Sequence, residues 1–93
     1  MQFYVGQMVF SKMGRDVGLC FVVLGLEGDF AYITDGKLRK IAKPKKKKLK
    51  HLQPTKHIDF NLKYAIENKK FIKDSDIRES IKKYRGEPSS QKP

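Results

Sequence analysis

The segment "GLCFVVLGLEGDFAYITDG", residues 18–36, contains the longest apolar run of the chain, residues 19–26. β-Branched and aromatic residues recur there between glycine and aspartate, which predicts strands at residues 18–27 and 29–35 joined by a tight reversal at Gly28-Asp29. The first of these strands is apolar on both of its alternating faces. It is therefore expected to be the central strand of a sheet that curls on itself.

Further strands are expected on either side of this pair. Residues 6–12 ("GQMVFSK") and 37–41 ("KLRKI") have strand-like composition. Asp35-Gly36 favours a two-residue type I′ turn into the second of them, because both positions of that turn need positive φ. Residues 49–58 predict a short strand at the edge of the sheet, since Pro54 has no amide to donate to a ladder. The strands are expected to follow one another as a meander.

After residue 58 the pattern becomes helical. "DFNLKYAIENKKF" places Leu62, Ala65 and Ile66 on one face of a first helix, with Asp59 as the expected N-cap. In residues 73–86, apolar side chains recur at helical spacing at Ile77, Ile81 and Tyr84.

The ends of the second helix carry their own signals. Asp74 or Ser75 is the expected cap, and Asp76 suits the positive end of the helix dipole. Lys82, Lys83 and Arg85 precede Gly86, which is expected to end the helix. Residues 87–93 ("EPSSQKP") are expected to be disordered.

Composition indicates one small domain that is mainly β with α. The chain has 93 residues, 39% of them hydrophobic, and a net charge of +11. Residues 1–35 hold two basic and four acidic side chains, a net charge of −2. Residues 36–57 hold ten Lys or Arg and no acid, a net charge of +10, and residues 58–93 hold nine basic and six acidic side chains, a net charge of +3. Positive charge concentrated in one segment predicts a polyanionic partner, with nucleic acid as the first candidate.

No catalytic, metal or cofactor site is expected. Cys20 lies in the apolar central strand and predicts a buried thiol. His51 and His57 have no cysteine or acid cluster near them in sequence, and are expected at the surface or against phosphate. Asp29 and Asp35 sit at turns, where aspartate bonds backbone amides, and no phosphate-binding glycine loop is present. These observations argue against an enzyme.

The location is expected to be cytoplasmic and the protein is not expected to bind membranes. The start "MQFYVGQMVF" lacks the basic residues and long apolar run of a signal peptide, and Cys20 is the single cysteine. The lysine run also lacks the apolar stripe of a helix that lies on a membrane.

Residues 5–55 resemble a known family. Gly6-Gln7, "SKMGRD" at 11–16 followed by Gly18, "DG" at 35–36 with "KLRK" behind it, and "PKKKKLKHL" at 44–52 occur in order and at similar spacing in the KOW-type RNA-binding domain of large-ribosomal-subunit protein fourteen of eukaryotes and archaea, and in its short bacterial relatives. The resemblance implies a small SH3-like (KOW) β-barrel over residues 1–57, with its basic segment at 37–57, followed by a two-helix extension over 58–86.

The resemblance also implies where RNA binds. The loop after the first strand and the basic segment would touch phosphates. The residues are Lys12 and Arg15 in the loop and, in the segment, Arg39, Lys40, Lys43, Lys45, Lys46, Lys47, Lys48, Lys50 and His51. Lys37, at the start of the same basic run, is a further candidate by its charge. Gly14 and Gly18 are expected to shape the turn that presents Arg15, while Asp16 either orients Arg15 or closes the turn. Base stacking by Tyr4, Phe30 or Tyr32 is disfavoured, because a small barrel needs its aromatics for the core.

The expected function is non-catalytic binding of ribosomal RNA, or another structured RNA, on the large ribosomal subunit through a lysine-rich loop. The C-terminal helices offer a face for a protein partner. KOW-like barrels of NusG transcription factors can also bind protein, so the alternative is a protein-interaction module of the transcription machinery. Binding to DNA also stays open, since duplex DNA attracts lysine as well.

Overall fold

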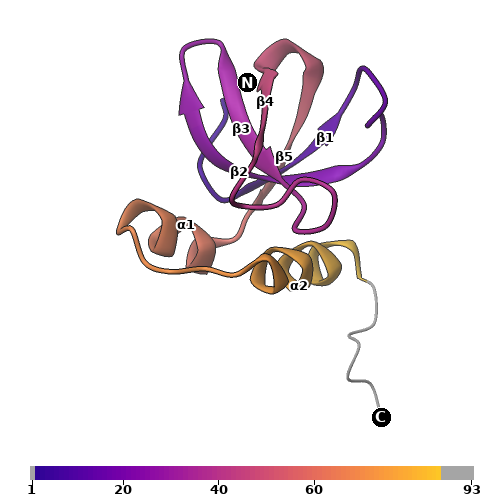
Figure 1. Ribbon diagram of the computed structural model, residues 1–93. Coiled ribbons are helices and arrows are strands. Elements are labelled where there is room, and N and C mark those ends of the chain that lie inside the picture. Colours follow the sequence, from indigo (N-terminus) through magenta and orange to yellow (C-terminus); the bar gives the residue numbers. More distant parts are fainter. Residues whose placement is uncertain (1, 87–93) are drawn as a thin grey trace.

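A five-stranded antiparallel sheet and two C-terminal helices make up the computed structural model, which describes residues 2–86 (Figure 1). The elements in chain order are β1 (Gln7–Ser11), β2 (Cys20–Glu27), β3 (Phe30–Thr34), β4 (Lys45–Lys48), the 3₁₀ turn η1 (Leu49–His51), β5 (Leu52–Ile58), α1 (Phe60–Glu67) and α2 (Asp74–Arg85). The strand order is β4-β3-β2-β1-β5, so β2 is the central strand and β5 an edge strand, as the sequence predicts.

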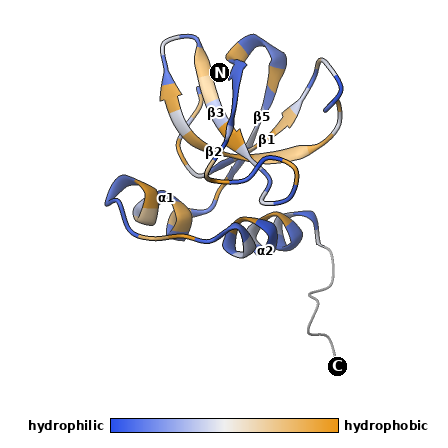
Figure 2. Cartoon of the chain, in the orientation of Figure 1, coloured by the Kyte–Doolittle hydropathy of each residue, from blue (hydrophilic) through white to orange (hydrophobic). Residues whose placement is uncertain are grey.

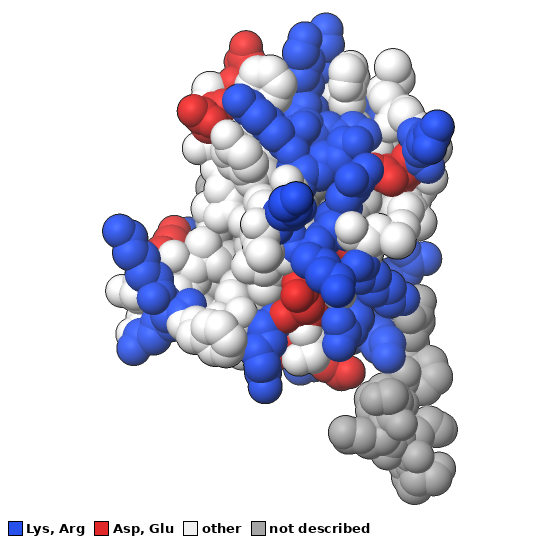
Figure 3. All heavy atoms as spheres, in the orientation of Figure 1, with Lys and Arg blue, Asp and Glu red and all other residues white. Residues whose placement is uncertain are grey.

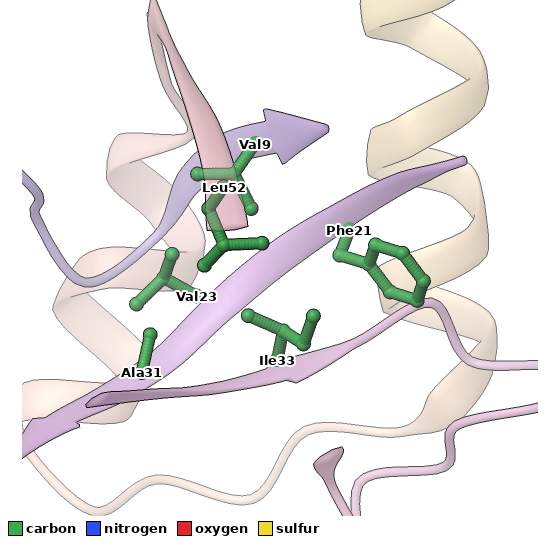
Figure 4. Close-up of a cluster of buried hydrophobic side chains, with 6 residues drawn as sticks. All are labelled: Val9, Phe21, Val23, Ala31, Ile33 and Leu52. Atoms are coloured by element: carbon green, nitrogen blue, oxygen red, sulfur yellow. The ribbon is translucent and has the colours of Figure 1, made fainter. Parts of the chain in front are cut away.

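One face of the sheet surrounds a hydrophobic core. Side chains from β1, β2, β3 and β5 contact one another there: Val9, Phe21, Val23, Ala31, Ile33 and Leu52 (Figure 4). Because strands on both sides of β2 contribute to one cluster, the sheet curves around it. All six side chains are essentially buried, so this cluster contributes to the hydrophobic stabilisation of the fold.

The helices cover part of the opposite face of the sheet and leave the end of the β2–β3 hairpin free (Figure 1). Met8, Cys20 and Val22 point to this side and form a second cluster with Leu62 of α1 and Ile77 of α2. Successive residues of β2 thus enter different cores, because side chains alternate across a strand. This alternation explains why β2 is apolar on both faces, and Figure 2 shows the contrast with the hydrophilic β4.

The prediction of a strand at residues 37–41 is wrong. Residues 35–44 form a loop in which one carboxylate oxygen of Asp35 accepts the amides of Lys37 and Arg39, each at 2.9 Å. Asp74 of α2 accepts the amide of Ile41 at 2.8 Å, so helix contacts replace a strand ladder. Gly36 is required for this packing, since a Cβ there would lie 2.5 Å from the carbonyl oxygen of Asp74.

The fourth strand is instead the lysine run itself. β4 consists of Lys45–Lys48 and pairs with β3, although lysine has a modest strand propensity. The expectation of a lysine-rich loop is therefore corrected: the central lysines belong to the sheet. Pairing along β3 supplies the backbone hydrogen bonds, and tertiary context overrides the local preference.

Both helices form where the periodicity predicts them. Asp59 caps α1 by accepting the amides of Asn61 and Leu62 at 3.0 and 3.1 Å. The prediction that Asp74 or Ser75 caps α2 is wrong, because the N-cap residue is Lys73. Asp74 instead accepts the amide of Ile41, and the carboxylate of Asp76 accepts the amide of Lys73 at 2.8 Å. Gly86 follows the last residue of α2, as expected. The tail predicted at 87–93 lies outside the described residues.

Candidate nucleic-acid interface

The four lysines of β4 face two ways. Lys45 and Lys47 pair with Ile33 and Ala31, which belong to the enclosed core, whereas Lys46 and Lys48 pair with Tyr32 and Phe30. Since side chains alternate along a strand, the first pair points toward the enclosed side of the sheet and the second pair away from it. Four identical residues therefore have two different environments.

Lys47 is the buried lysine of this strand, with 8% of its surface exposed. Its ammonium donates to the hydroxyl oxygen of Ser11 at 2.8 Å and to the carbonyl oxygen of Met13 at 2.7 Å. Burial lowers the pKa of this ammonium, with neighbouring cations contributing in the same direction. Lys47 thus fastens the loop after β1 to β4, and its charge is directed into the protein.

Asp16 makes a second connection between the same loop and the basic segment. One oxygen of its carboxylate lies 3.5 Å from a guanidinium nitrogen of Arg39 and 3.9 Å from the ammonium of Lys45. The Asp16 side chain is only 10% exposed. The sequence left two roles open for Asp16, orienting Arg15 or closing the turn. Its carboxylate pairs with Arg39 and Lys45 and not with Arg15. Its backbone carbonyl closes the turn by accepting the amide of Leu19 at 2.9 Å.

The loop after β1 carries two of the predicted cations. Gly14 and Gly18 have φ of +85° and +86°, which permits the sharp path of the loop, and Arg15 between them is exposed. The amide of Lys12 donates to the carbonyl oxygen of His51 at 2.8 Å, so the start of the loop lies beside η1. The loop and the basic segment, separated in sequence, are neighbours in the fold.

Exposed cations gather over β4, η1 and the adjoining loops in a broad band (Figure 3). We call this band the basic surface. Its exposed members are Lys12, Arg15, Lys40, Lys43, Lys46, Lys48 and Lys50, and its half-buried members are Arg39, Lys45 and His51. Partial burial and the neighbouring lysines hold the pKa of His51 below its usual range, so its imidazole is neutral at pH 7.

Lys37 lies apart from β4, beside α2. Together with Arg78, Lys82 and Arg85 it lines a depression between the loop after β3 and the helix. In the sequence, Lys82 and Arg85 are interpreted as charges at the end of the helix, and Arg78 is not singled out. The spacing of Arg78, Lys82 and Arg85 by four and three residues puts them on one helix face, and this is the signal that could have indicated the depression.

A separate arrangement occupies the other side of β4. The ammonium of Lys46 lies 4.7 Å from the ring centre of Phe30 and 5.9 Å from that of Tyr32. The Tyr32 hydroxyl donates to Glu27 at 2.5 Å, and Lys46 is 3.8 Å from the same carboxylate. The hydroxyl and then Lys46 lower the pKa of Glu27, so this carboxylate is ionised at neutral pH.

The cysteine, aspartate and histidine that were considered for catalytic or metal-binding roles make structural contacts. Cys20 is buried, as predicted, and burial raises the pKa of its thiol to about 11, which keeps it protonated at neutral pH. Asp35 bonds backbone amides, as predicted. His57 packs against Tyr84 with ring centres 4.9 Å apart. Among residues 2–86, no three or more His, Cys, Asp or Glu side chains come together in a way that could hold a metal ion.

Comparison with known proteins does not assign the chain to a family. No family model matches it, and no curated protein matches it significantly. Within the described residues, no helix has the length and hydrophobicity needed to cross a membrane. Any assignment of function therefore depends on the basic surface and on how the fold holds it in place.

Proposed function

We propose that this protein is a non-catalytic RNA-binding protein that binds structured RNA, with ribosomal RNA of the large subunit as the foremost candidate, through phosphate contacts of the basic surface. The observation that carries the proposal is the double attachment of the loop after β1. Lys47 bonds Ser11 and Met13, and Asp16 pairs with Arg39 and Lys45.

This attachment matters because it orders cations before any ligand arrives. Lys12 and Arg15 are held beside β4 and η1, where Lys46, Lys48 and Lys50 are exposed. Side chains on a fixed backbone lose less entropy on meeting phosphates than those on a flexible tail. A rigid array of cations supports phosphate binding better than a merely solvated charge run does.

RNA is favoured as the polyanion by the chemistry of the array. Double-stranded RNA is bound mostly through its shape and its backbone, because its deep major groove hides the base edges. The exposed cations are predominantly lysines, which are point charges suited to phosphates and carry no fork for reading bases. DNA as the preferred ligand is an outcome of the test below.

The same proposal includes the finer fold assignment and the cellular setting. An SH3-like barrel of the KOW type is supported by the strand order and by the single cluster that the curved sheet surrounds. A cytoplasmic location belongs to the same proposal and stands or falls with the ribosomal RNA partner.

The test is binding of a labelled, fully paired RNA hairpin over a range of salt concentrations, with the matching DNA hairpin in parallel. Each neutralised phosphate contributes about 0.7 to 0.9 to the slope of log affinity against log salt, and we expect at least about five contacts. Tighter binding to DNA, or affinity that does not depend on salt, would overturn the proposal. Sedimentation of a cell lysate then locates the protein with or away from the large subunit.

A protein-docking function through α1 is the second candidate. Phe60 and Tyr64 lie one helical turn apart and are 69% and 60% exposed, and Phe71 beyond the helix is 87% exposed. Aromatic side chains exposed in a group are typical of protein contact surfaces. A partner that stays bound after nuclease treatment, and that is lost in Phe60→Ser with Tyr64→Ser, is the expected result for this candidate.

A further inference from the structure

The aromatic pair on β3 lies outside the hydrophobic cores. Phe30 and Tyr32 alternate with Ala31 and Ile33, which enter the enclosed core, so their rings are on the opposite face of the sheet. Within residues 2–86, neither ring is a member of the two core clusters, and both residues are half-buried. The expectation that a small domain needs these rings for its core is therefore wrong for this pair.

The two rings are held in place without being covered by the helices. They lie on the β2–β3 hairpin, the end of which projects away from α1 and α2 (Figure 1). Tyr32 is fixed by its hydroxyl bond to Glu27 and by packing at Gly25, where an added Cβ would meet the ring at 3.9 Å. A ring fixed at both its edge and its hydroxyl is suited to act as a stacking surface.

Lys46 shows what kind of group these rings attract. Its ammonium lies over both ring faces, at 4.7 Å and 5.9 Å from the centres. A cation is drawn there by the electron-rich ring face, and a nucleobase uses the same face when it stacks. Lys48 pairs with Phe30 on the same side of β4, so phosphate-binding charge lies directly beside the rings.

We infer that Phe30 and Tyr32 form a stacking platform for an unpaired base, so that the RNA bound by this protein contains a bulged or looped nucleotide next to a paired segment. This inference rests on the proposed function. On binding, Lys46 leaves the ring faces for a phosphate of the flipped-out nucleotide, while the rest of the basic surface contacts the paired segment. The platform supplies a preference between RNA shapes that the lysine array by itself lacks.

The experiment compares two RNA duplexes, each annealed from two strands so that no loop offers an unpaired base. One duplex is fully paired, and the other differs from it by a single bulged 2-aminopurine. We expect the wild-type protein to bind the bulged duplex about fivefold or more tightly, and to quench the 2-aminopurine fluorescence as the base stacks. Phe30→Leu is expected to remove both the preference and the quenching.

Control variants separate stacking from folding and charge. Tyr64→Leu removes an exposed aromatic ring of α1 and is expected to leave the preference unchanged. Tyr32→Phe keeps the ring but removes the hydroxyl bond to Glu27, and is expected to retain most of the preference. Urea unfolding of each variant shows whether it is folded under the binding conditions.

The outcomes distinguish this inference from the proposed function. Salt-dependent binding with equal affinity for both duplexes, or a preference that survives Phe30→Leu together with Tyr32→Leu, overturns the stacking platform and leaves RNA binding intact. Failure to bind either duplex overturns both. A preference that disappears in the ring variants and persists in Tyr64→Leu supports the platform.

Discussion

The ammonium nitrogen of Lys47 lies 2.8 Å from the hydroxyl oxygen of Ser11, although the two residues are 36 positions apart in the sequence. This bond joins β4 to the end of β1 and to the loop that carries Lys12 and Arg15. A lysine inside a run of lysines thus has a structural task, which is to hold the loop with Lys12 and Arg15 beside β4.

Replacing Lys47 with alanine should destabilise the fold. The variant loses both bonds of the buried ammonium, to Ser11 and to Met13, so we expect a loss of about 1 to 3 kcal/mol in the free energy of unfolding. The Ser11 hydroxyl still donates to the Met13 carbonyl at 3.0 Å, so the loop keeps that bond. Lys48→Ala is the matched control from the same strand, since Lys48 is exposed, and we expect a change within about 0.5 kcal/mol. Urea unfolding of both variants measures the difference. Equal losses would show that the bonds of Lys47 add no stability.

Asp16→Asn is informative because net charge and side-chain positioning predict opposite effects on RNA affinity. The substitution raises the net charge, so a purely electrostatic surface would bind RNA more tightly. Because Asp16 holds Arg39 and Lys45 in place, we expect Asp16→Asn to bind RNA about fivefold more weakly. This is a loss of about 1 kcal/mol in the free energy of binding. Glu79→Gln on α2 is the control with the same change in charge. Tighter binding by Asp16→Asn, equal to that of the control, would contradict a positioning role.

The sequence predicts most of the fold because the apolar pattern is strong where the core is. β1, β2, β3 and both helices follow from alternation, periodicity and the Asp59 cap. Residues 37–41 were mistaken for a strand because a local signal, Asp35-Gly36, also suits a loop closed by the Asp35 carboxylate. Only the approach of Asp74 from a distant helix decides between the two.

The candidate site is less predictable than the fold. A run of identical lysines contains no pattern from which the inward and outward residues could be told apart, and the register with β3 settles it. The pairing of Asp16 with Arg39 joins two loops distant in sequence, so spacing carries no sign of it. The positions of Phe30 and Tyr32 were available from alternation with Ala31 and Ile33, but their exposure depends on where the helices end.

Stability at alkaline pH should report the burial of Cys20. Its pKa is about 11 in the folded protein against an ordinary value of 9.0. The unfolded chain therefore releases this proton at lower pH than the folded protein does. The contribution is fully present below pH 9 and is lost as the pH rises toward 11. We expect the free energy of unfolding to fall over this interval more steeply in the wild type than in Cys20→Ala. Parallel profiles for the two proteins would show that the thiol is not shielded from water.

Salt titrations of single-lysine variants should separate the outward lysines from cations elsewhere on the surface. Lys48→Ala and Lys50→Ala each remove an exposed ammonium of the basic surface, so each should lower the slope of log affinity against log salt by about 0.7 to 0.9. Lys69→Ala, at an exposed position beyond α1, removes the same charge away from β4 and should leave the slope nearly unchanged. Fluorescence anisotropy with the paired RNA hairpin gives these slopes directly. If Lys69→Ala lowers the slope as much as Lys48→Ala does, net charge alone governs binding and the basic surface is not a defined interface. A loss confined to Lys48 and Lys50 means that the RNA lies along β4 and η1, next to the loop that Lys47 and Asp16 hold in place.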